Sequence, residues 1–210
     1  SKLESGRTIQ LEALSIKEAM EQTLRNYKLN AEEKNVKLKL NVENNLTFVL
    51  GNWDMLLQVF DNLVGNALKF SQEGGTINLK AYTWPDICVA SPVDLDNKAP
   101  HCEILSPMPK IRVEVSDTGY GISEIDQQRI FERFYRVEDS VHTEVGTGLG
   151  LSIVKGIVDK HGSERRMASE PKTGTTFWFE LPLEDSDADE LLLKSARKNW
   201  ELENDKTLIK

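Results

Sequence analysis

The sequence lacks a long hydrophobic segment and a surplus of basic residues. No run approaches the roughly 18 consecutive apolar residues of a transmembrane helix, and the first residues, SKLESGRTIQLEA, contain no apolar signal-peptide core. Lysine and arginine number 26 against 34 aspartates and glutamates, a formal net charge of −8. Because nucleic-acid binding needs a basic field, this balance argues against such a partner. We expect a cytoplasmic segment without membrane contact, whose full-length protein can carry an anchor elsewhere.

Cysteine and histidine are scarce. The cysteines, Cys88 and Cys102, lack the paired spacing of a zinc site and indicate no disulfide framework. A reducing compartment is therefore expected, and neither cysteine is given a role. His101, His142 and His161 are isolated from one another, and each is interpreted as a surface or lid histidine rather than a titrating functional group.

A chain of 210 residues can bury one substantial core. Apolar periodicity predicts helices over 15–35, 53–70 and 149–161, a short helix after an N-cap at Ser123, and strands over 36–42, 46–50, 76–82, 111–116 and 175–181. Helices interleaved with strands in this order favour a two-layer α/β (α+β) sandwich. Its sheet is expected to be mixed and mostly antiparallel, with the helices on one face.

The predicted domain occupies residues 15–183, between a linker at 1–14 and an acidic tail at 184–210. Five prolines interrupt 83–110, which is interpreted as an insertion. The tail begins with the acidic run 184–190 and continues as LLLKSARKNWELENDKTLIK. It is expected to form a short helix or to order only on contact with a partner.

The helix over 53–70 carries polar side chains beside its apolar stripe. Asn62, Asn66 and Lys69 fall at i, i+4 and i+7 and therefore share one face. An amide oxygen is a suitable Mg²⁺ ligand, and a lysine one turn further can meet phosphate. Taken alone, an ordinary polar helix face explains the pattern equally well.

Two glycine motifs follow strands or precede helices. Asp117-Thr118-Gly119-Tyr120-Gly121 ends a strand, and its glycines permit positive φ and close backbone approach of a ligand. Alone, it is equally typical of a tight strand-to-helix turn. The second motif, GTGLGL at 146–151, opens a helix whose free N–H groups favour a phosphate chain. It lacks the Gly-Lys-Ser/Thr ending of a P-loop and the glycine spacing of a dinucleotide fingerprint.

In this order, the motifs resemble those of the sensor histidine kinase catalytic domain. NLVGNALKF (62–70) is similar to the N box, 117–121 to the G1 box, 131–134 to the F box and 146–151 to the G2 box. The resemblance covers about 16–183 and implies the Bergerat ATP-binding fold of gyrase, Hsp90 and MutL. It also makes KLESG at 2–6 similar to the end of a dimerisation helix. The KLESGR entry, the insertion and the acidic tail resemble those of cyanobacterial or plastid stress-sensing kinases.

The resemblance implies a role for each motif position. Asn66, helped by Asn62, would ligate Mg²⁺; Lys69 would meet phosphate; Asp117 would bind the adenine amine; and Thr175 would support the adenine through water. The remaining contacts with ATP would come from Phe70, Gly119, Gly121, Ile122, Phe131, Arg133, Phe134, Arg136, Gly146, Thr147, Gly148, Leu149, Gly150 and Leu151. Among these, the two phenylalanines of the F box would anchor the root of a lid over the phosphates.

The resemblance further implies transfer rather than hydrolysis. ATPases of the superfamily carry a water-activating glutamate where this chain has Asn62, and an amide cannot act as a general base. None of the three histidines lies in a His-Glu/Asp-x-x-Thr-Pro context. The acceptor would therefore belong to a dimerisation domain upstream, within a homodimer that passes phosphate to a response regulator. A nucleotide-dependent docking module and an ATPase of the same superfamily remain the alternatives.

Overall fold

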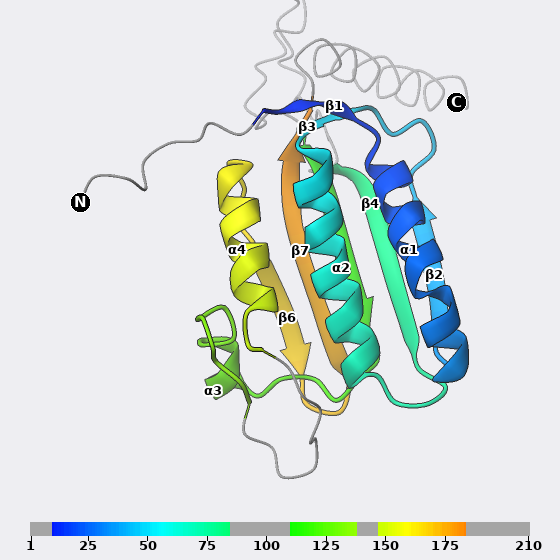
Figure 1. Cartoon of the computed structure of the whole chain (residues 1–210), viewed down its shortest axis with the longest axis vertical. Helices are drawn as coiled ribbons and strands as arrows, with labels where there is room; N and C mark the ends of the chain where they lie inside the picture. The colour runs from blue at the N-terminus through cyan, green and yellow to red at the C-terminus, as the bar shows by residue number, and fades with distance from the viewer. Residues whose placement is uncertain (1–9, 85–109, 138–146, 184–210) are drawn as a thin grey trace, which may run out of the picture.

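The computed structural model describes residues 10–84, 110–137 and 147–183 (Figure 1). Along the chain, the elements are β1 (Glu12–Leu14), α1 (Ile16–Glu33), β2 (Lys37–Val42), β3 (Val49–Gly51), α2 (Trp53–Phe70), β4 (Thr76–Trp84), β5 (Lys110–Asp117), α3 (Glu124–Gln127), α4 (Gly150–Lys160), β6 (Arg166–Glu170) and β7 (Gly174–Pro182). No helix in these ranges has the length and apolar character needed to span a membrane.

A five-stranded sheet forms one layer, in the order β2-β4-β5-β7-β6. β2 and β4 are parallel, and the other three pairs are antiparallel. α1, α2 and α4 cover one face of this sheet (Figure 1). A second, two-stranded sheet joins β1 to β3, and a bridge from Val49 to Leu183 links it to the end of β7. The expected two-layer sandwich is confirmed.

α2 lies at the centre of the helical layer because of its apolar stripe. Asn52 caps the helix, its side chain accepting from the backbone N–H of Met55 at 3.1 Å. The stripe is fully or nearly fully buried and comprises Leu56, Val59, Phe60, Leu63, Val64, Ala67 and Leu68. Phe60 meets Phe179 of β7 at a ring-centroid distance of 6.4 Å. Each such large side chain stabilises the fold by about 1.5–3 kcal/mol, so the polar residues of α2 are held in fixed positions.

The alternation predicted for the last strand also holds. Thr175, Phe177, Phe179 and Leu181 are buried beneath the helices, and the alternate residues are half-buried on the opposite face. β5 repeats this pattern, with buried Ile111, Val113 and Val115. The two strands pair so that Asp117 stands opposite Thr175, which places these two residues at the same end of the sheet.

The structure differs from the sequence prediction at several boundaries. Residues 12–14, assigned above to the linker, form β1 and bury Leu14 in the core. The strand expected over 46–50 is confined to Val49–Gly51. β6 was not predicted, because only Met167 and Ser169 alternate inward among charged neighbours on this edge strand.

Several sequence predictions lie outside the described residues. They concern Cys88, Cys102, His101, His142, Gly146, positions 85–109 of the insertion and the tail. His161 is described, and the expectation of a surface histidine was wrong because its side chain is 4% exposed. Its Nδ1 lies 2.8 Å from the carbonyl of Ile157, and its Nε2 accepts from the N–H of Asn52 at 3.0 Å. It therefore joins the end of α4 to the start of α2.

Candidate functional site

The polar face of α2 borders a cavity of about 480 Å³. Asn62, Asn66 and Lys69 all line it, as their helical spacing predicted. The Asn62 amide donates to the carbonyl of Gln58 at 2.7 Å, one turn earlier. This contact uses the Nδ2 donor and leaves the Oδ1 acceptor available to the cavity.

The start of α4 packs closely against this face. A Cβ atom on Gly150 would lie 2.8 Å from Oδ1 of Asn62 and 3.7 Å from Nδ2 of Asn66. Glycine at this position therefore lets the helix N-terminus approach the two amides. Backbone N–H groups at a helix N-terminus carry partial positive charge, so the cavity wall combines amide oxygens with an anion-binding end.

The far end of α2 is held by a side chain that the sequence motifs did not reveal. Lys34, which follows α1, donates from Nζ to the carbonyls of Leu68 at 2.9 Å and Lys69 at 2.8 Å. These carbonyls have no partner within their own helix, and a cation near a helix C-terminus is also favoured by the helix dipole. Lys34 thus fixes the turn from which Lys69 and Phe70 reach the cavity.

Asp117 supplies a carboxylate at the end of β5. Its Oδ1 accepts from the N–H of Gly119 at 2.8 Å. Burial raises the pKa of the Asp117 carboxyl above its ordinary value, and hydrogen bonds from the backbone N–H groups of Gly119 and Thr175 partly oppose that rise. The Thr175 hydroxyl is 2.9 Å from that of Ser169. A half-desolvated carboxylate beside a buried hydroxyl suits a ligand with its own N–H donors.

The loop after Asp117 requires glycine at two points. A side chain on Gly119 would lie 2.5 Å from the carbonyl oxygen of Phe70. Gly121 has φ of +69°, and its Cβ would collide with the carbonyl of Glu170. The next N–H, that of Ile122, is held by the hydroxyl of Ser169 at 2.8 Å. The loop is thus fixed on both sides, against the end of α2 and against β6.

The segment after α3 forms the outer wall. Phe131 packs edge-on against Phe177, with centroids 6.1 Å apart. Phe134 was also expected to anchor the root of the lid, and its ring contributes little to this because the residue is 71% exposed. Its backbone makes the anchor instead, at φ of +65°, with its N–H donating to the carbonyl of Gly148 at 2.9 Å. Arg133 is exposed outside the cavity, whereas Arg136 lines it.

A polar network that the sequence did not predict holds the same wall. Asp126 in α3 accepts from the hydroxyls of Tyr135 at 2.7 Å and Ser123 at 2.5 Å. The Arg129 guanidinium lies 4.4 Å from the centre of the Tyr135 ring. Hydrogen bonds from Ser123 and then Tyr135 lower the pKa of Asp126, so the carboxylate stays ionised and Tyr135 stays directed along the cavity wall.

The structure brings most of the predicted site residues together. Those that line the cavity are Asn62, Asn66, Lys69, Phe70, Asp117, Gly121, Ile122, Arg136, Thr147, Gly148, Gly150, Leu151 and Thr175. Gly119, Phe131, Arg133, Phe134 and Leu149 are described but do not line it. Lining residues that the prediction missed include Asp61, Gly65, Tyr120 and Tyr135. Asp61 and Gly65 precede Lys69 at intervals of four, and this helical spacing could have identified them.

Comparison with known proteins identifies the family. The family described as "Histidine kinase-, DNA gyrase B-, and HSP90-like ATPase" matches residues 51–185. The chain belongs to this family. Within the HATPase_c family, it is 49% identical over 182 residues to the drug sensory protein A of Synechocystis, covering 86% of this chain and 25% of that protein. It is 45% identical over 181 residues to the sensor-like histidine kinase ycf26 of Porphyra purpurea, covering 86% of this chain and 26% of that protein.

These relatives confirm the resemblance to cyanobacterial and plastid kinases. This HATPase_c chain spans about a quarter of the length of the curated relatives it matches. Full-length ShkA in complex with AMPPNP superimposes with a TM-score of 0.66 at 27% identity, covering 85% of this chain and 32% of that one. The catalytic domain of the histidine kinase ThkA shares the fold, with a TM-score of 0.63 at 24% identity. The match covers 83% of this chain and 97% of that one. The chain thus has the fold of histidine kinase catalytic domains.

Proposed function

We propose that the cavity binds ATP with Mg²⁺ and that the domain transfers the γ-phosphate to a histidine on a dimerisation domain of the same protein. The proposal rests on one observation, that different kinds of polar group from separate elements converge on one cavity. Amides and an ammonium from α2, a carboxylate from β5 and the N-terminal turn of α4 border one cavity of about 480 Å³. Segments that lie far apart in the chain thereby offer complementary groups to the base and to the phosphates.

The end of the cavity near β5 suits adenine. The Asp117 carboxylate can accept from the exocyclic amine, and the buried Thr175 hydroxyl, held by Ser169, can support the ring through a water. Phe70 lies beside it with 40% of its surface exposed, and the Lys69 ammonium is 5.0 Å from the centre of that ring. An apolar face next to two acceptors fits a flat base with one donor edge.

The end near α4 suits phosphates. Gly148 and Gly150 give the backbone close access, and the helix dipole favours negative charge there. Lys69 adds a positive charge from α2. The amide oxygens of Asn62 and Asn66 fit the hard, oxygen-preferring chemistry of Mg²⁺, which would neutralise charge on the transferred phosphoryl group.

The same residues favour transfer over hydrolysis. The family resemblance aligns Asn62 with the water-activating glutamate of ATPases, and an amide cannot take a proton. Of the described residues that line the cavity, only Asp61 and Asp117 are acidic. We assign Asp117 to the base, so positioning and electrostatic stabilisation remain as the principal means of catalysis. The histidine would then pass its phosphate to an aspartate of a response regulator.

Calorimetric titration of the chain with a non-hydrolysable ATP analogue, with and without Mg²⁺, tests the binding step. We expect one-to-one binding that Mg²⁺ strengthens, and its loss in Asn66→Ala. Asn26→Ala, an exposed asparagine on α1, is the matched control and should bind normally. Equal affinity in both variants would remove the α2 amides from the site.

Transfer needs a second experiment. The chain is joined to the upstream helices of its own full-length protein and incubated with radiolabelled ATP. Acid-labile, base-stable label on a histidine supports the kinase reaction. Nucleotide binding without label would favour the docking module, and released phosphate without label would favour the ATPase.

A further inference from the structure

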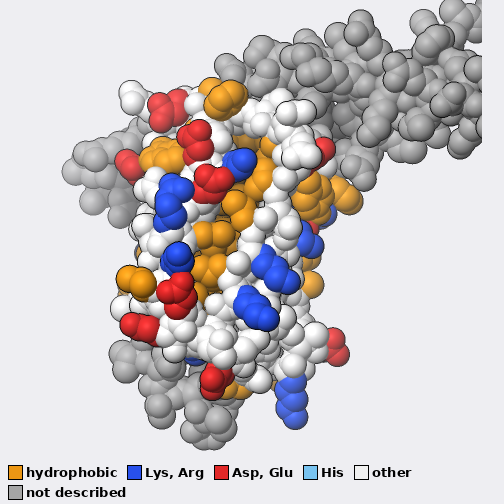
Figure 2. All heavy atoms as spheres, turned by 90° about the vertical axis from the view of Figure 1, so that its right-hand side faces the viewer, with side chains coloured by type: hydrophobic (Ala, Val, Ile, Leu, Met, Phe, Trp, Pro, Cys, Tyr) orange, Lys and Arg blue, Asp and Glu red, His pale blue; other side chains and the backbone are white. Residues whose placement is uncertain are grey.

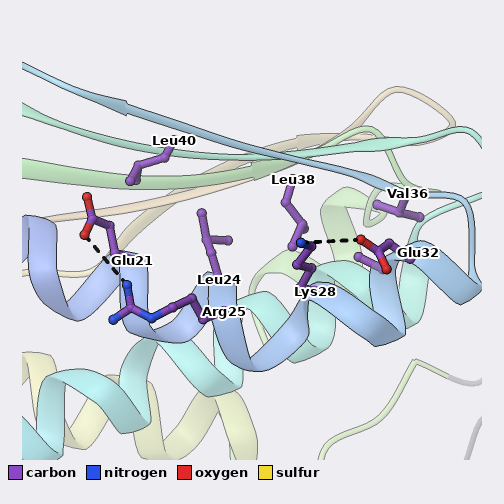
Figure 3. Close-up of a pocket in the computed structure, with 9 residues that line it drawn as sticks. Glu21, Leu24, Arg25, Lys28, Glu32, Val36, Leu38 and Leu40 are labelled. Atoms are coloured by element: carbon purple, nitrogen blue, oxygen red, sulfur yellow. Dashed lines mark ion pairs between the residues drawn. The ribbon is translucent and has the colours of Figure 1, made fainter.

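A second hollow lies away from the nucleotide site, between α1 and the edge of the sheet. It has a volume of about 450 Å³ and an apolar floor formed by Leu24 of α1 with Val36, Leu38 and Leu40 on the β2 side. Figure 3 shows Leu24 pointing toward Leu38 and Leu40 across the hollow. Viewed from the sheet edge in Figure 2, an apolar stripe runs between two rows of charged side chains.

β2 is an edge strand, so one side of its backbone is unpaired within the described sheet. Lys37 and Glu43 donate their N–H groups toward the β4 side, to the carbonyls of Gly75 and Ala81. In a parallel pair, alternate residues point their backbone groups the other way. Leu38 and Leu40 therefore present N–H and C=O groups to the open edge, directly beside the apolar floor.

The two rims of the hollow differ in charge. On α1, Arg25 pairs with Glu21 at 3.8 Å and Lys28 with Glu32 at 3.9 Å, so that rim is balanced (Figure 3). On β2, the exposed residues Lys37 and Lys39 point to the other face of the sheet, and no ion pair is found for either among the described ranges. An added strand would thus meet apolar residues on one face and positive charge on the other.

The chain's own tail contains a matching segment. Residues 200–203 read Trp-Glu-Leu-Glu, with apolar and acidic residues in strict alternation. Sixteen residues separate Leu183, the last described residue, from this segment. Reaching the open edge from β7 requires about 19 Å, or four strand spacings, whereas sixteen extended residues span roughly 50 Å. The tether is therefore long enough.

The direction of the chain also fits. β7 is antiparallel to β5, β5 to β4, and β4 is parallel to β2, so β7 and β2 run the same way. The chain leaves β7 at the end of the sheet where β2 also finishes. A segment entering from that end would run antiparallel to β2.

We propose that residues 200–203 add to the open edge of β2 as an antiparallel strand. The register that matches both faces pairs Trp200 with Leu40, Glu201 with Lys39, Leu202 with Leu38 and Glu203 with Lys37. In this register, the apolar side chains fill the hollow and each glutamate lies opposite a lysine. The occupant is thus this chain's own tail, and the proposal is independent of the nucleotide site.

Disulfide trapping in the full chain tests the register. In a background of Cys88→Ser and Cys102→Ser, Lys39→Cys is combined with Glu201→Cys, a non-hydrogen-bonded pair with Cα atoms about 4.5 Å apart, within disulfide reach. We expect most chains to form an intramolecular disulfide under mild oxidation. The matched control pairs Lys39→Cys with Leu202→Cys, whose side chains would face opposite sides, and should cross-link at least tenfold less.

Hydrogen exchange supplies a readout without new cysteines. The amides of Leu38 and Leu40 should exchange at least tenfold faster in Glu201→Lys/Glu203→Lys than in the unmodified chain. Disulfides between chains would instead assign the edge to a second copy. Equal trapping of both cysteine pairs would contradict the proposed register. No trapping together with unchanged exchange would show that no strand is added to the edge of β2. Either result would overturn the proposal.

Discussion

Replacing Asp117 with asparagine tests whether this carboxylate binds the adenine amine. The substitution keeps the shape of the side chain but exchanges a charged acceptor for an amide. A hydrogen bond to a charged group contributes about 1.5–3 kcal/mol, which corresponds to roughly 10- to 150-fold weaker ATP binding. Calorimetric titration with the non-hydrolysable analogue measures this loss directly.

A nucleotide without the exocyclic amine supplies the control. Purine riboside triphosphate offers no such donor, so Asp117→Asn should change its affinity little. The coupling between the amine and the carboxylate then appears as the difference between the two losses. If the variant weakened both nucleotides equally, Asp117 would act on the fold of the loop rather than on the base, and the adenine assignment would fail.

The pH dependence follows from the raised pKa of Asp117. The proposed contact with adenine requires the ionised carboxylate, so the affinity for ATP should start to fall at a higher pH than an ordinary aspartate would produce. For folding, the sign is opposite. A carboxyl whose pKa is raised in the folded state favours folding at low pH, and that contribution is lost as pH rises through the folded pKa. At neutral pH, thermal unfolding should therefore show Asp117→Asn to be at least as stable as the unmodified domain.

Further substitutions test the supports of the cavity. Lys34→Met removes both hydrogen bonds to the last carbonyls of α2 and should lower the free energy of unfolding by about 1–3 kcal/mol, measured by denaturant titration. Asp126→Ala and Tyr135→Phe should each weaken nucleotide binding several-fold. In the double variant, the two losses of binding free energy should not add, because both remove the same hydrogen bond. Additive losses would show that the two residues act independently. The lowered pKa of Asp126 also means that its contribution to stability should disappear as pH falls through that pKa. Gly148→Ala, at φ of +69° against the backbone of the outer wall, should cost about 1–2 kcal/mol, whereas Gly156→Ala, which meets nothing within 4 Å, should be neutral or stabilising.

Periodicity located the elements whose burial is one-sided. The helix over 53–70 was predicted with its observed bounds, because apolar residues recur at every third or fourth position and those from Leu56 to Leu68 are buried. β7 was recognised for the same reason at period two. β6 was missed because an edge strand needs few inward apolar residues, and β1 because three residues are too few to show a period.

The residues of the site also fall into two groups, those that a local motif predicts and those that only tertiary contacts reveal. Asn66, Asp117 and Gly150 were found because each belongs to a short motif whose spacing carries its chemistry. Lys34 and Ser169 contact residues that are distant in the sequence. Lys34 binds the end of α2, and Ser169 binds the loop after β5. No local sequence pattern predicts these contacts. The role of His161 was misjudged for the same reason, since its partner Asn52 lies 109 positions away.

These contacts make the two ends of the cavity unequal. At the adenine end, Thr175 is 6% exposed, and Ser169 ties both it and Ile122 to β6. At the phosphate end, Phe134 is 71% exposed, its backbone N–H donates to the carbonyl of Gly148, and the network around Asp126 is only half-buried. Because few buried apolar contacts imply a low cost of local opening, the wall over the phosphates should open before the base site does. The proposed transfer, in which the γ-phosphate of bound ATP meets a histidine on another domain, requires freedom at this end.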